Sequence, residues 1–187
     1  MKSSSIQKLS ASALLIAVGI VIPMVSPLKF VMEPASFTLA SHVAVFIAMV
    51  ISPGVAAAVA VGTTIGFLLG GFPLVIVLRA ASHIVFALGG ALYLQRSPNT
   101  NDSPVALRAF SFVIALVHAL CELVVVSAFY FGGNMGESYY QQGFLQSVLL
   151  LVGLGTVIHS MVDFEIAHAV VAALQKQKGF AALTHKA

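Results

Sequence analysis

The chain has 187 residues, of which 59% are hydrophobic and only 8% charged, with a formal net charge of +3. A soluble domain carries about a quarter charged residues, so this composition excludes a protein that mainly faces water. The few basic residues lie near expected helix ends, which excludes a nucleic-acid-binding patch as the reason for the positive charge. The sequence therefore predicts an all-α integral membrane protein that forms a single domain over residues 1–187.

Apolar stretches of about 18 residues, the length that crosses ~30 Å of hydrocarbon, predict a bundle of six transmembrane helices. The first helix ends near Pro23 and Pro27, because proline removes a backbone donor, and Ser52-Pro53 separates the second helix from the third. The last helix is longer than a bilayer needs, so we expect it to tilt or project. The expected helices cover residues of about 9–24, 38–51, 54–69, 74–95, 105–131 and 144–174.

The connections differ in polarity. Residues 28–37 are half apolar yet include Lys29 and Glu33, which favours an extended loop or a re-entrant hairpin folded against the bundle. This mixed polarity motivates the hypothesis that the segment is a gate. Residues 96–104 and 132–142 are rich in turn-forming residues and predict polar loops.

The basic residues predict the orientation in the cell membrane. With six spans, both termini lie on one side, and that side also holds the loop between the fourth and fifth helices. The other side carries Lys29 alone, with Arg79 inside a helix. The bias places both termini in the cytoplasm. The basic residues on the cytoplasmic side are Lys2, Lys8, Arg96, Arg108, Lys176, Lys178 and Lys186.

Ionisable residues inside membrane helices are costly and usually mark a site or a buried pair. There is no HExxH, CxxC or GxSxG motif, and the histidines are scattered one or two per helix. The sequence therefore predicts neither an enzyme nor a metal or other cofactor. The ionisable residues in the expected helices are His42, Arg79, His83, His118, Glu122, His159, Asp163, Glu165 and His168.

Arg79 and His83 are four residues apart and share a helix face. Counted from the outer helix ends, Arg79, His83 and Glu122 lie roughly 9, 15 and 13 Å deep, so they can meet in the outer half of the bundle. Two interpretations stay open: a site where Arg79 binds a carboxylate while His83 or Glu122 bonds a heteroatom, or a structural Arg79–Glu122 pair. His42 either lines the same cavity or packs.

His159 and Asp163 also share a face, but the same count puts them toward the cytoplasmic half. We expect them to lock helices together, and we expect Glu165 and His168 to reach the inner interface.

Two small-xxx-small motifs predict closely packed helix faces. Gly62-x-x-x-Gly66 is expected to pack within the bundle. Ala13-x-x-x-Ala17 lies near the cytoplasmic end, where a partner can dock.

The size, the six helices, the cytoplasmic termini and Ala13-x-x-x-Ala17 resemble the substrate-binding (S) components of energy-coupling factor (ECF) vitamin transporters. The resemblance implies that Ala13 and Ala17 dock on a transmembrane scaffold subunit that carries two ATPases. It also implies that the vitamin binds between the last three helices and the outer loops, with the loop after the first helix as a gate. No GxxxxGK[ST] motif is present, so ATP must be hydrolysed by partner chains.

Residues 33–42, 51–53, 62–67 and 70–83 further resemble the niacin-specific members. This implies a high-affinity niacin-binding subunit of an ATP-driven importer. The carboxylate of nicotinate matches Arg79, its ring nitrogen matches His83 or a loop group, and its ring can stack on an aromatic side chain. The expected binding residues are Arg79, His83, Glu122, His42, Glu33, Phe37, Phe72, Asn134, Tyr139 and Tyr140.

Other functions are compatible with the same residues. An S component for another small anionic vitamin, such as pantothenate, is the nearest alternative ligand class. A stand-alone proton-coupled transporter would use Glu122, Asp163 and the histidines as a relay, and an intramembrane enzyme would use His159 with Asp163.

Overall fold

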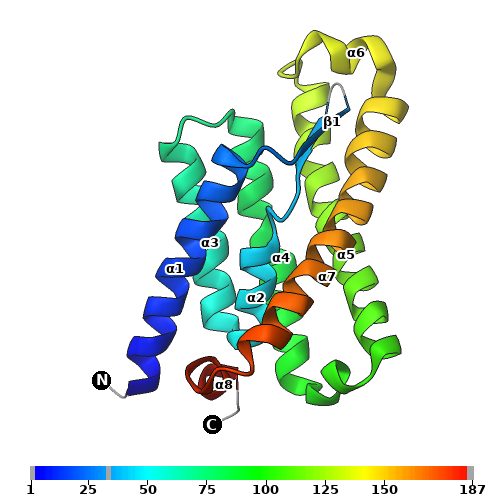
Figure 1. The fold of residues 1–187 in the computed structure, drawn as a ribbon. Helices are drawn as coiled ribbons and strands as arrows, with labels where there is room; N and C mark the ends of the chain where they lie inside the picture. Colours follow the sequence, from blue (N-terminus) through cyan, green and yellow to red (C-terminus); the bar gives the residue numbers. More distant parts are fainter. Residues whose placement is uncertain (1–2, 33–34, 185–187) are drawn as a thin grey trace.

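The computed structural model describes residues 3–32 and 35–184 as a bundle of helices with a two-stranded hairpin at one end (Figure 1). Within these residues, four helical stretches are long and apolar enough to cross a membrane. The protein is therefore a helical, multi-pass membrane protein. The four stretches are Ser5–Val25, Leu74–Arg96, Pro104–Phe131 and Glu137–Leu174.

The first half of the chain contains α1 (Ser3–Val25), β1 (Lys29–Met32), β2 (Ala35–Thr38), α2 (Val43–Ile51) and α3 (Pro53–Leu69). Pro53 stands at the first turn of α3, where its missing N–H costs nothing, and the Ser52 side chain accepts a bond from the Val55 backbone N–H. At 1.5 Å per residue, α2 extends only about 13 Å, so it does not cross a bilayer by itself.

The second helix begins later than its expected start at residue 38. Thr38 still pairs with Lys29 in the hairpin, and the backbone N–H groups of Ala40 and His42 donate to Asp163 on α7. This turn, in which Ala40 has a positive φ of 68°, delays the helix to Val43. A buried carboxylate far along the chain thus sets the start of α2.

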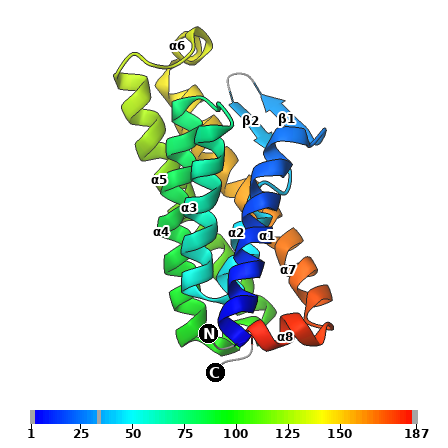
Figure 2. The ribbon, with the colours of Figure 1, turned by 90° about the vertical axis from the view of Figure 1, so that its left-hand side faces the viewer.

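The segment expected as an extended loop or a re-entrant hairpin contains β1 and β2, which pair antiparallel with Phe30 opposite Phe37. It lies at the end of the bundle opposite the start of α1, beside α6 (Figure 2). The expected site residue Glu33 lies outside the described residues.

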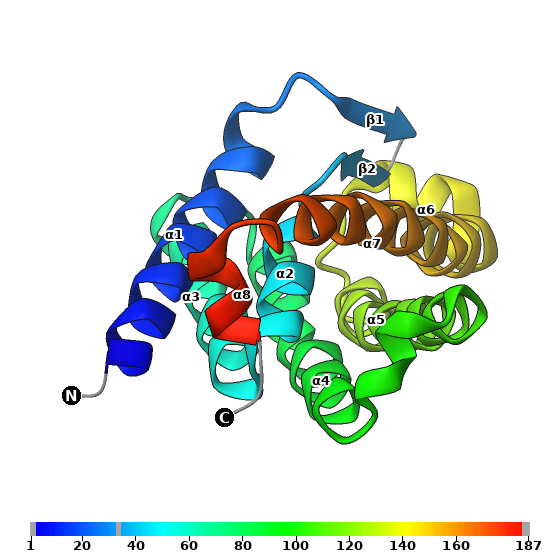
Figure 3. The same ribbon diagram turned by 60° about the horizontal axis from the view of Figure 1, so that its bottom comes forward.

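The second half contains α4 (Leu74–Arg96), the 3₁₀ turn η1 (Pro98–Asp102), α5 (Pro104–Phe131), α6 (Glu137–Phe144), η2 (Leu145–Leu154), α7 (Gly155–Leu174) and α8 (Lys178–Thr184). The helix expected over 144–174 is divided, because η2 is wound as a π-helix before α7 continues as an α-helix. The expected loop 132–142 is partly helical as α6, which bends into η2 at Gly143 with φ 78°. The short α8 lies against α1 and α2 at the other end (Figure 3).

The two small-residue motifs lie in different surroundings. Gly62 and Gly66 of α3 face Ile16 and Ile20 of α1, and a side chain at either glycine would collide with those isoleucines. The expected intramolecular role of this motif is therefore confirmed. In contrast, Ala13 and Ala17 of α1 are exposed.

Buried phenylalanines form a layer across the middle of the bundle. The Phe46 ring lies 5.8 Å from Phe86 and 5.3 Å from Phe164, and Phe110 lies 5.8 Å from Phe164. The layer separates the end that carries the hairpin and α6 from the end that carries α8. Polar side chains gather on the hairpin side of it.

Candidate functional site

A cavity of about 600 Å³ lies between the hairpin, α1, α3, α4 and the start of α2, with α5, α6 and α7 completing its wall. A larger cavity of about 870 Å³ lies at the α8 end, and the ionisable residues in its wall are Lys8, Asp102 and His168, fewer than line the first cavity. The charged residues converge on the first cavity, which is therefore the candidate site. Eight of the ten expected binding residues line it: Phe37, His42, Phe72, Arg79, His83, Glu122, Asn134 and Tyr139.

Glu122, which is 2% exposed, lies at the floor of this cavity. One of its oxygens, Oε2, accepts a bond from Arg79 Nη2 at 2.8 Å and another from Thr156 Oγ1 at 2.6 Å. The expected contact between Arg79 and Glu122 is thus present, and Thr156 adds α7 to it. One carboxylate joins α4, α5 and α7, which fixes the position of the guanidinium.

The Arg79 guanidinium is not fully used by this pair. Its Nε has no hydrogen-bond partner in the described part of the chain, and its side chain is 19% exposed. A guanidinium offers five N–H donors in a planar fork, and Glu122 bonds to Nη2 alone, so donors remain on a side chain that lines the cavity. The pair and a ligand-binding role are therefore compatible.

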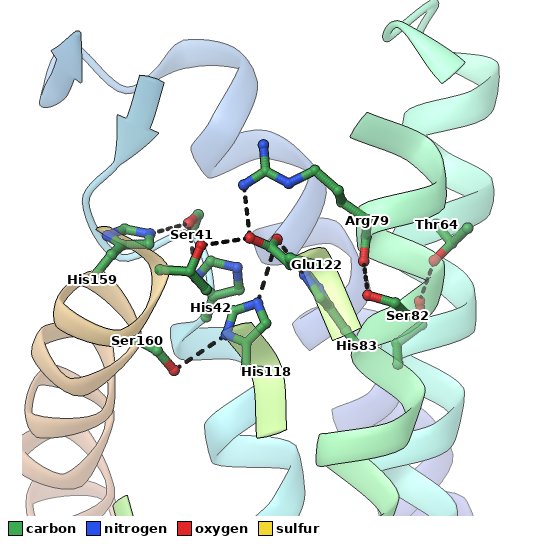
Figure 4. Close-up of polar contacts among 12 residues, drawn as sticks. Ser41, His42, Thr64, Arg79, Ser82, His83, His118, Glu122, His159 and Ser160 are labelled. Atoms are coloured by element: carbon green, nitrogen blue, oxygen red, sulfur yellow. Dashed lines mark hydrogen bonds and ion pairs between the residues drawn. The ribbon is translucent and has the colours of Figure 1, made fainter. Parts of the chain in front are cut away.

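Three histidines surround the other side of Glu122 (Figure 4). The rings of His42, His83 and His118 lie 4.6 to 4.9 Å apart, in edge-to-face arrangements. His118, which was not expected in the site, is fully buried below the cavity with its Nδ1 3.2 Å from Ser160 Oγ. Its i,i+4 spacing to Glu122 was the signal in the sequence.

His159 and Asp163 lie nearer the cavity than expected. His159 lines the cavity, 5.0 Å from the His42 ring and 5.4 Å from Phe37. Asp163 locks the turn before α2 by accepting the backbone N–H groups of Ala40 and His42. The expected depth was too great because a π-helical segment advances less per residue than the α-helix assumed in the count.

Tyr140 is an expected site residue that does not line the cavity. Its hydroxyl donates to the Tyr130 carbonyl at 3.0 Å and accepts the Met135 N–H at 3.2 Å. Because α6 is a helix, neighbouring residues point about 100° apart, and only Tyr139 faces the cavity. Because residues 132–142 were predicted as a loop, the sequence could not indicate which of Tyr139 and Tyr140 faces the cavity.

The structure also groups residues that can hold a metal ion. One ligand atom each from His42, His83, His118 and Glu122 lies within 4.8 Å of the others, and His42 forms a second group with His159 and Asp163. The sequence analysis predicted no metal site, because the histidines are scattered over separate helices.

Comparisons with known proteins bear on the family. No family model matches the chain, and no solved structure matches it. The chain is 42% identical over 166 residues to the niacin transporter NiaX of Lactococcus lactis subsp. cremoris (strain MG1363). The aligned region covers 89% of this chain and 73% of that protein. The protein therefore belongs to the family of this niacin transporter, and the predicted resemblance to the niacin-specific S components is confirmed.

Proposed function

We propose that this protein is the niacin-binding S component of an ATP-driven ECF importer. The observation that carries the proposal is the partly unused Arg79 guanidinium in a cavity with aromatic walls, in a chain related to a niacin transporter. The relative supports a role in niacin transport without covalent chemistry. Nicotinate, the anionic form of niacin, is the proposed ligand.

The chemistry of the cavity suits a flat aromatic anion. Arg79 offers its remaining N–H groups to a carboxylate, and charge-assisted bonds of this kind are strong in a desolvated site. Phe72 and Tyr139 supply aromatic faces at the wall, where a pyridine ring can stack. His83 or His42 can donate to the ring nitrogen as the appropriate neutral tautomer.

Glu122 has a supporting role in this proposal. Both contacts of its Oε2 hold neighbouring side chains, Arg79 and Thr156, and its negative charge balances the guanidinium. Since Thr156 also holds this oxygen, a substrate carboxylate would share the guanidinium with Glu122 and not displace it. Neutral nicotinamide lacks the charge that Arg79 would recognise.

The charge distribution supports an outward-facing cavity. Lys29 begins β1 at the hairpin end and lines the cavity, whereas most of the described basic residues lie toward the opposite end, where Figure 1 shows α8. By the positive-inside rule, the α8 end faces the cytoplasm and the cavity faces outward. The described basic residues at the α8 end are Lys8, Arg96, Arg108, Lys176 and Lys178.

The exposed face of α1 supports docking on a scaffold subunit. Ala13 and Ala17 are exposed, while Leu14 beside them is 66% exposed, so a small-residue groove lies next to a large apolar side chain. Another helix can approach closely there. The scaffold would supply the ATPases.

The hairpin is placed to act as the gate. Lys29 and Phe37 of the hairpin both line the cavity. Asn134, in the loop that follows α5, lines it too. Cysteines introduced at Lys29 and Asn134, in a chain where Cys121 is replaced by serine, would tie the hairpin to the loop after α5. The cross-link should block uptake while the protein still binds nicotinate; uptake that survives it contradicts the gate.

The first test is calorimetry of the purified protein in detergent with nicotinate, nicotinamide and pantothenate. Nicotinate should bind most tightly. Arg79→Ala should weaken it by about 1.5–3 kcal/mol, the usual contribution of hydrogen bonds to charged groups. Arg108→Ala, which removes an exposed guanidinium 3.7 Å from Glu165, is the matched control and should bind normally. If nicotinate does not bind, niacin is the wrong ligand; if Arg79→Ala has no effect, Arg79 is structural.

A further inference from the structure

We propose that His42, His83, His118 and Glu122 bind one divalent transition-metal ion of the zinc class at the floor of the cavity. The four ligand atoms lie within 4.8 Å of one another and come from the start of α2, from α4 and from α5. Imidazole and carboxylate are ligands that zinc and its neighbours prefer. The inference goes beyond the proposed function and does not depend on it.

The spacing around Glu122 fits a shared metal ion better than direct hydrogen bonds. Nε2 of His83 and Nε2 of His118 each lie 3.5 Å from Oε1 of Glu122. A hydrogen bond between such atoms would measure about 2.7–3.2 Å. Two ligands bound tetrahedrally to one zinc ion at about 2.1 Å lie about 3.4 Å apart.

The same nitrogens lack hydrogen-bond partners. Nε2 of His83 and Nε2 of His118 are buried without one among the residues that the structure describes, and the His118 side chain is 0% exposed. Buried polar atoms are nearly always satisfied, and a bound ion is one of the few explanations for an exception. Both atoms face the same carboxylate oxygen, so one ion would satisfy both.

Two of the three imidazoles are oriented from behind, as metal ligands usually are. His42 Nδ1 lies 3.0 Å from Asp163 Oδ2, and His118 Nδ1 lies 3.2 Å from Ser160 Oγ. A histidine that donates its Nδ1–H to such a partner keeps the lone pair of Nε2 for a metal. The Asp163 carboxylate, which can only accept, selects this tautomer for His42, and the Ser160 hydroxyl is compatible with it for His118.

The second cluster, of His42, His159 and Asp163, is the weaker candidate. Both Asp163 oxygens already accept N–H groups, from Ala40 at 2.7 Å and from His42 at 2.9 Å. In contrast, Arg79 and Thr156 bind Oε2 of Glu122, and the contacts of Oε1 within the described residues are the nitrogens of His83 and His118 at 3.5 Å. The ion therefore belongs at Glu122, with Asp163 supporting His42.

The test is a titration of metal-stripped, purified protein with Co²⁺, a coloured substitute for the spectroscopically silent Zn²⁺. One equivalent should bind with the visible absorption of tetrahedral Co²⁺, and Zn²⁺ should displace it. His118→Gln and His83→Gln should each weaken binding more than about 100-fold, since even supporting partners contribute 10–100-fold. The control is His168→Gln, an exposed histidine beside the α8-end cavity, which should bind normally.

Each outcome decides the proposal. Wild-type protein that elutes as one species, unfolds cooperatively and binds neither Co²⁺ nor Zn²⁺ overturns it. Binding that survives both His118→Gln and His83→Gln also overturns it, since the ion would then lie elsewhere. Nicotinate binding is measured separately by calorimetry, so a failure of the metal site leaves the niacin proposal intact, and the reverse holds.

Discussion

Asp163 should be among the residues on which the fold of the site most depends. Its side chain is 0% exposed, and it accepts the Ala40 N–H at 2.7 Å and the His42 N–H at 2.9 Å. His42 also brings its Nδ1 within 3.0 Å of the same carboxylate. These N–H groups precede the first turn of α2, where no intrahelical carbonyl can accept them. The side chain on α7 therefore acts as the cap of α2.

The size of the effect follows from these contacts. Asp163→Ala leaves the buried backbone N–H groups of Ala40 and His42 without their acceptor, and His42 Nδ1 keeps the Ser41 hydroxyl at 3.2 Å but loses the carboxylate. Breaking a buried charged contact from one side costs about 3–5 kcal/mol. Asp163→Asn keeps one acceptor oxygen but presents an NH₂ group to an N–H, so we expect about 1–3 kcal/mol. Both variants should also weaken nicotinate binding, because the same turn positions His42 at the cavity.

The measurement is thermal unfolding in detergent, followed by circular dichroism. The unfolding midpoint should be highest for wild type, lower for Asp163→Asn and lowest for Asp163→Ala. Glu165→Gln lies two residues further on the same helix, where the carboxylate is exposed, and should change stability by less than about 0.5 kcal/mol. If Asp163→Ala unfolds at the wild-type midpoint and binds nicotinate normally, the capping argument is refuted.

Two further predictions concern the faces of α1 and α3. Ala13→Trp should abolish uptake in cells that contain the scaffold and its ATPases, while nicotinate binding persists. The control is Ala109→Trp, at an exposed alanine of α5, which should leave uptake unchanged. An equal loss of uptake in both variants would contradict docking at this face of α1. Gly62→Ala should lower the unfolding midpoint, because the added Cβ collides with Ile16. Gly89→Ala, which has open space around it, should raise stability by up to about 1 kcal/mol. A stabilised Gly62→Ala variant would contradict the close packing of α3 against α1.

The part of the site that sequence could predict is the part carried by two regular helices. Arg79 and His83 share a face by their spacing, and α4 and α5 are continuous, so counting residues from the helix ends brought Glu122 to the right depth. The contact between Arg79 and Glu122 followed from that count. Nothing beyond helix geometry and charge was needed.

The rest depended on contacts between distant residues. Asp163 and Ala40 are separated by 123 positions. No local sequence pattern indicates that the Asp163 carboxylate binds the turn between the hairpin and α2. The π-helical winding of η2 brings His159 to the cavity, against a count made for an α-helix. The spacing of His118 places it on the same helix face as Glu122, but its contacts with His42 and His83 depend on how α2, α4 and α5 pack.

Glu122 offers a last prediction, because it is the counter-ion of the guanidinium that nicotinate would share. In the ligand-free protein it balances the partly buried guanidinium of Arg79. Glu122→Gln keeps an oxygen for Arg79 and Thr156 but removes the charge, so the guanidinium becomes an unbalanced cation in a desolvated site. The ligand-free variant should lose about 1–3 kcal/mol of stability. The anion of nicotinate would then restore neutrality.

A ligand that relieves this imbalance must bind the variant at least as tightly as it binds wild type, because it offsets a cost that only the ligand-free state bears in full. With chelator present to exclude metal ions, saturating nicotinate should therefore raise the unfolding midpoint of Glu122→Gln more than that of wild type. Nicotinamide, which has no charge, should give neither protein this extra rise. Weaker nicotinate binding to Glu122→Gln would instead mean that the carboxylate itself contacts the ligand, and the counter-ion argument would fail.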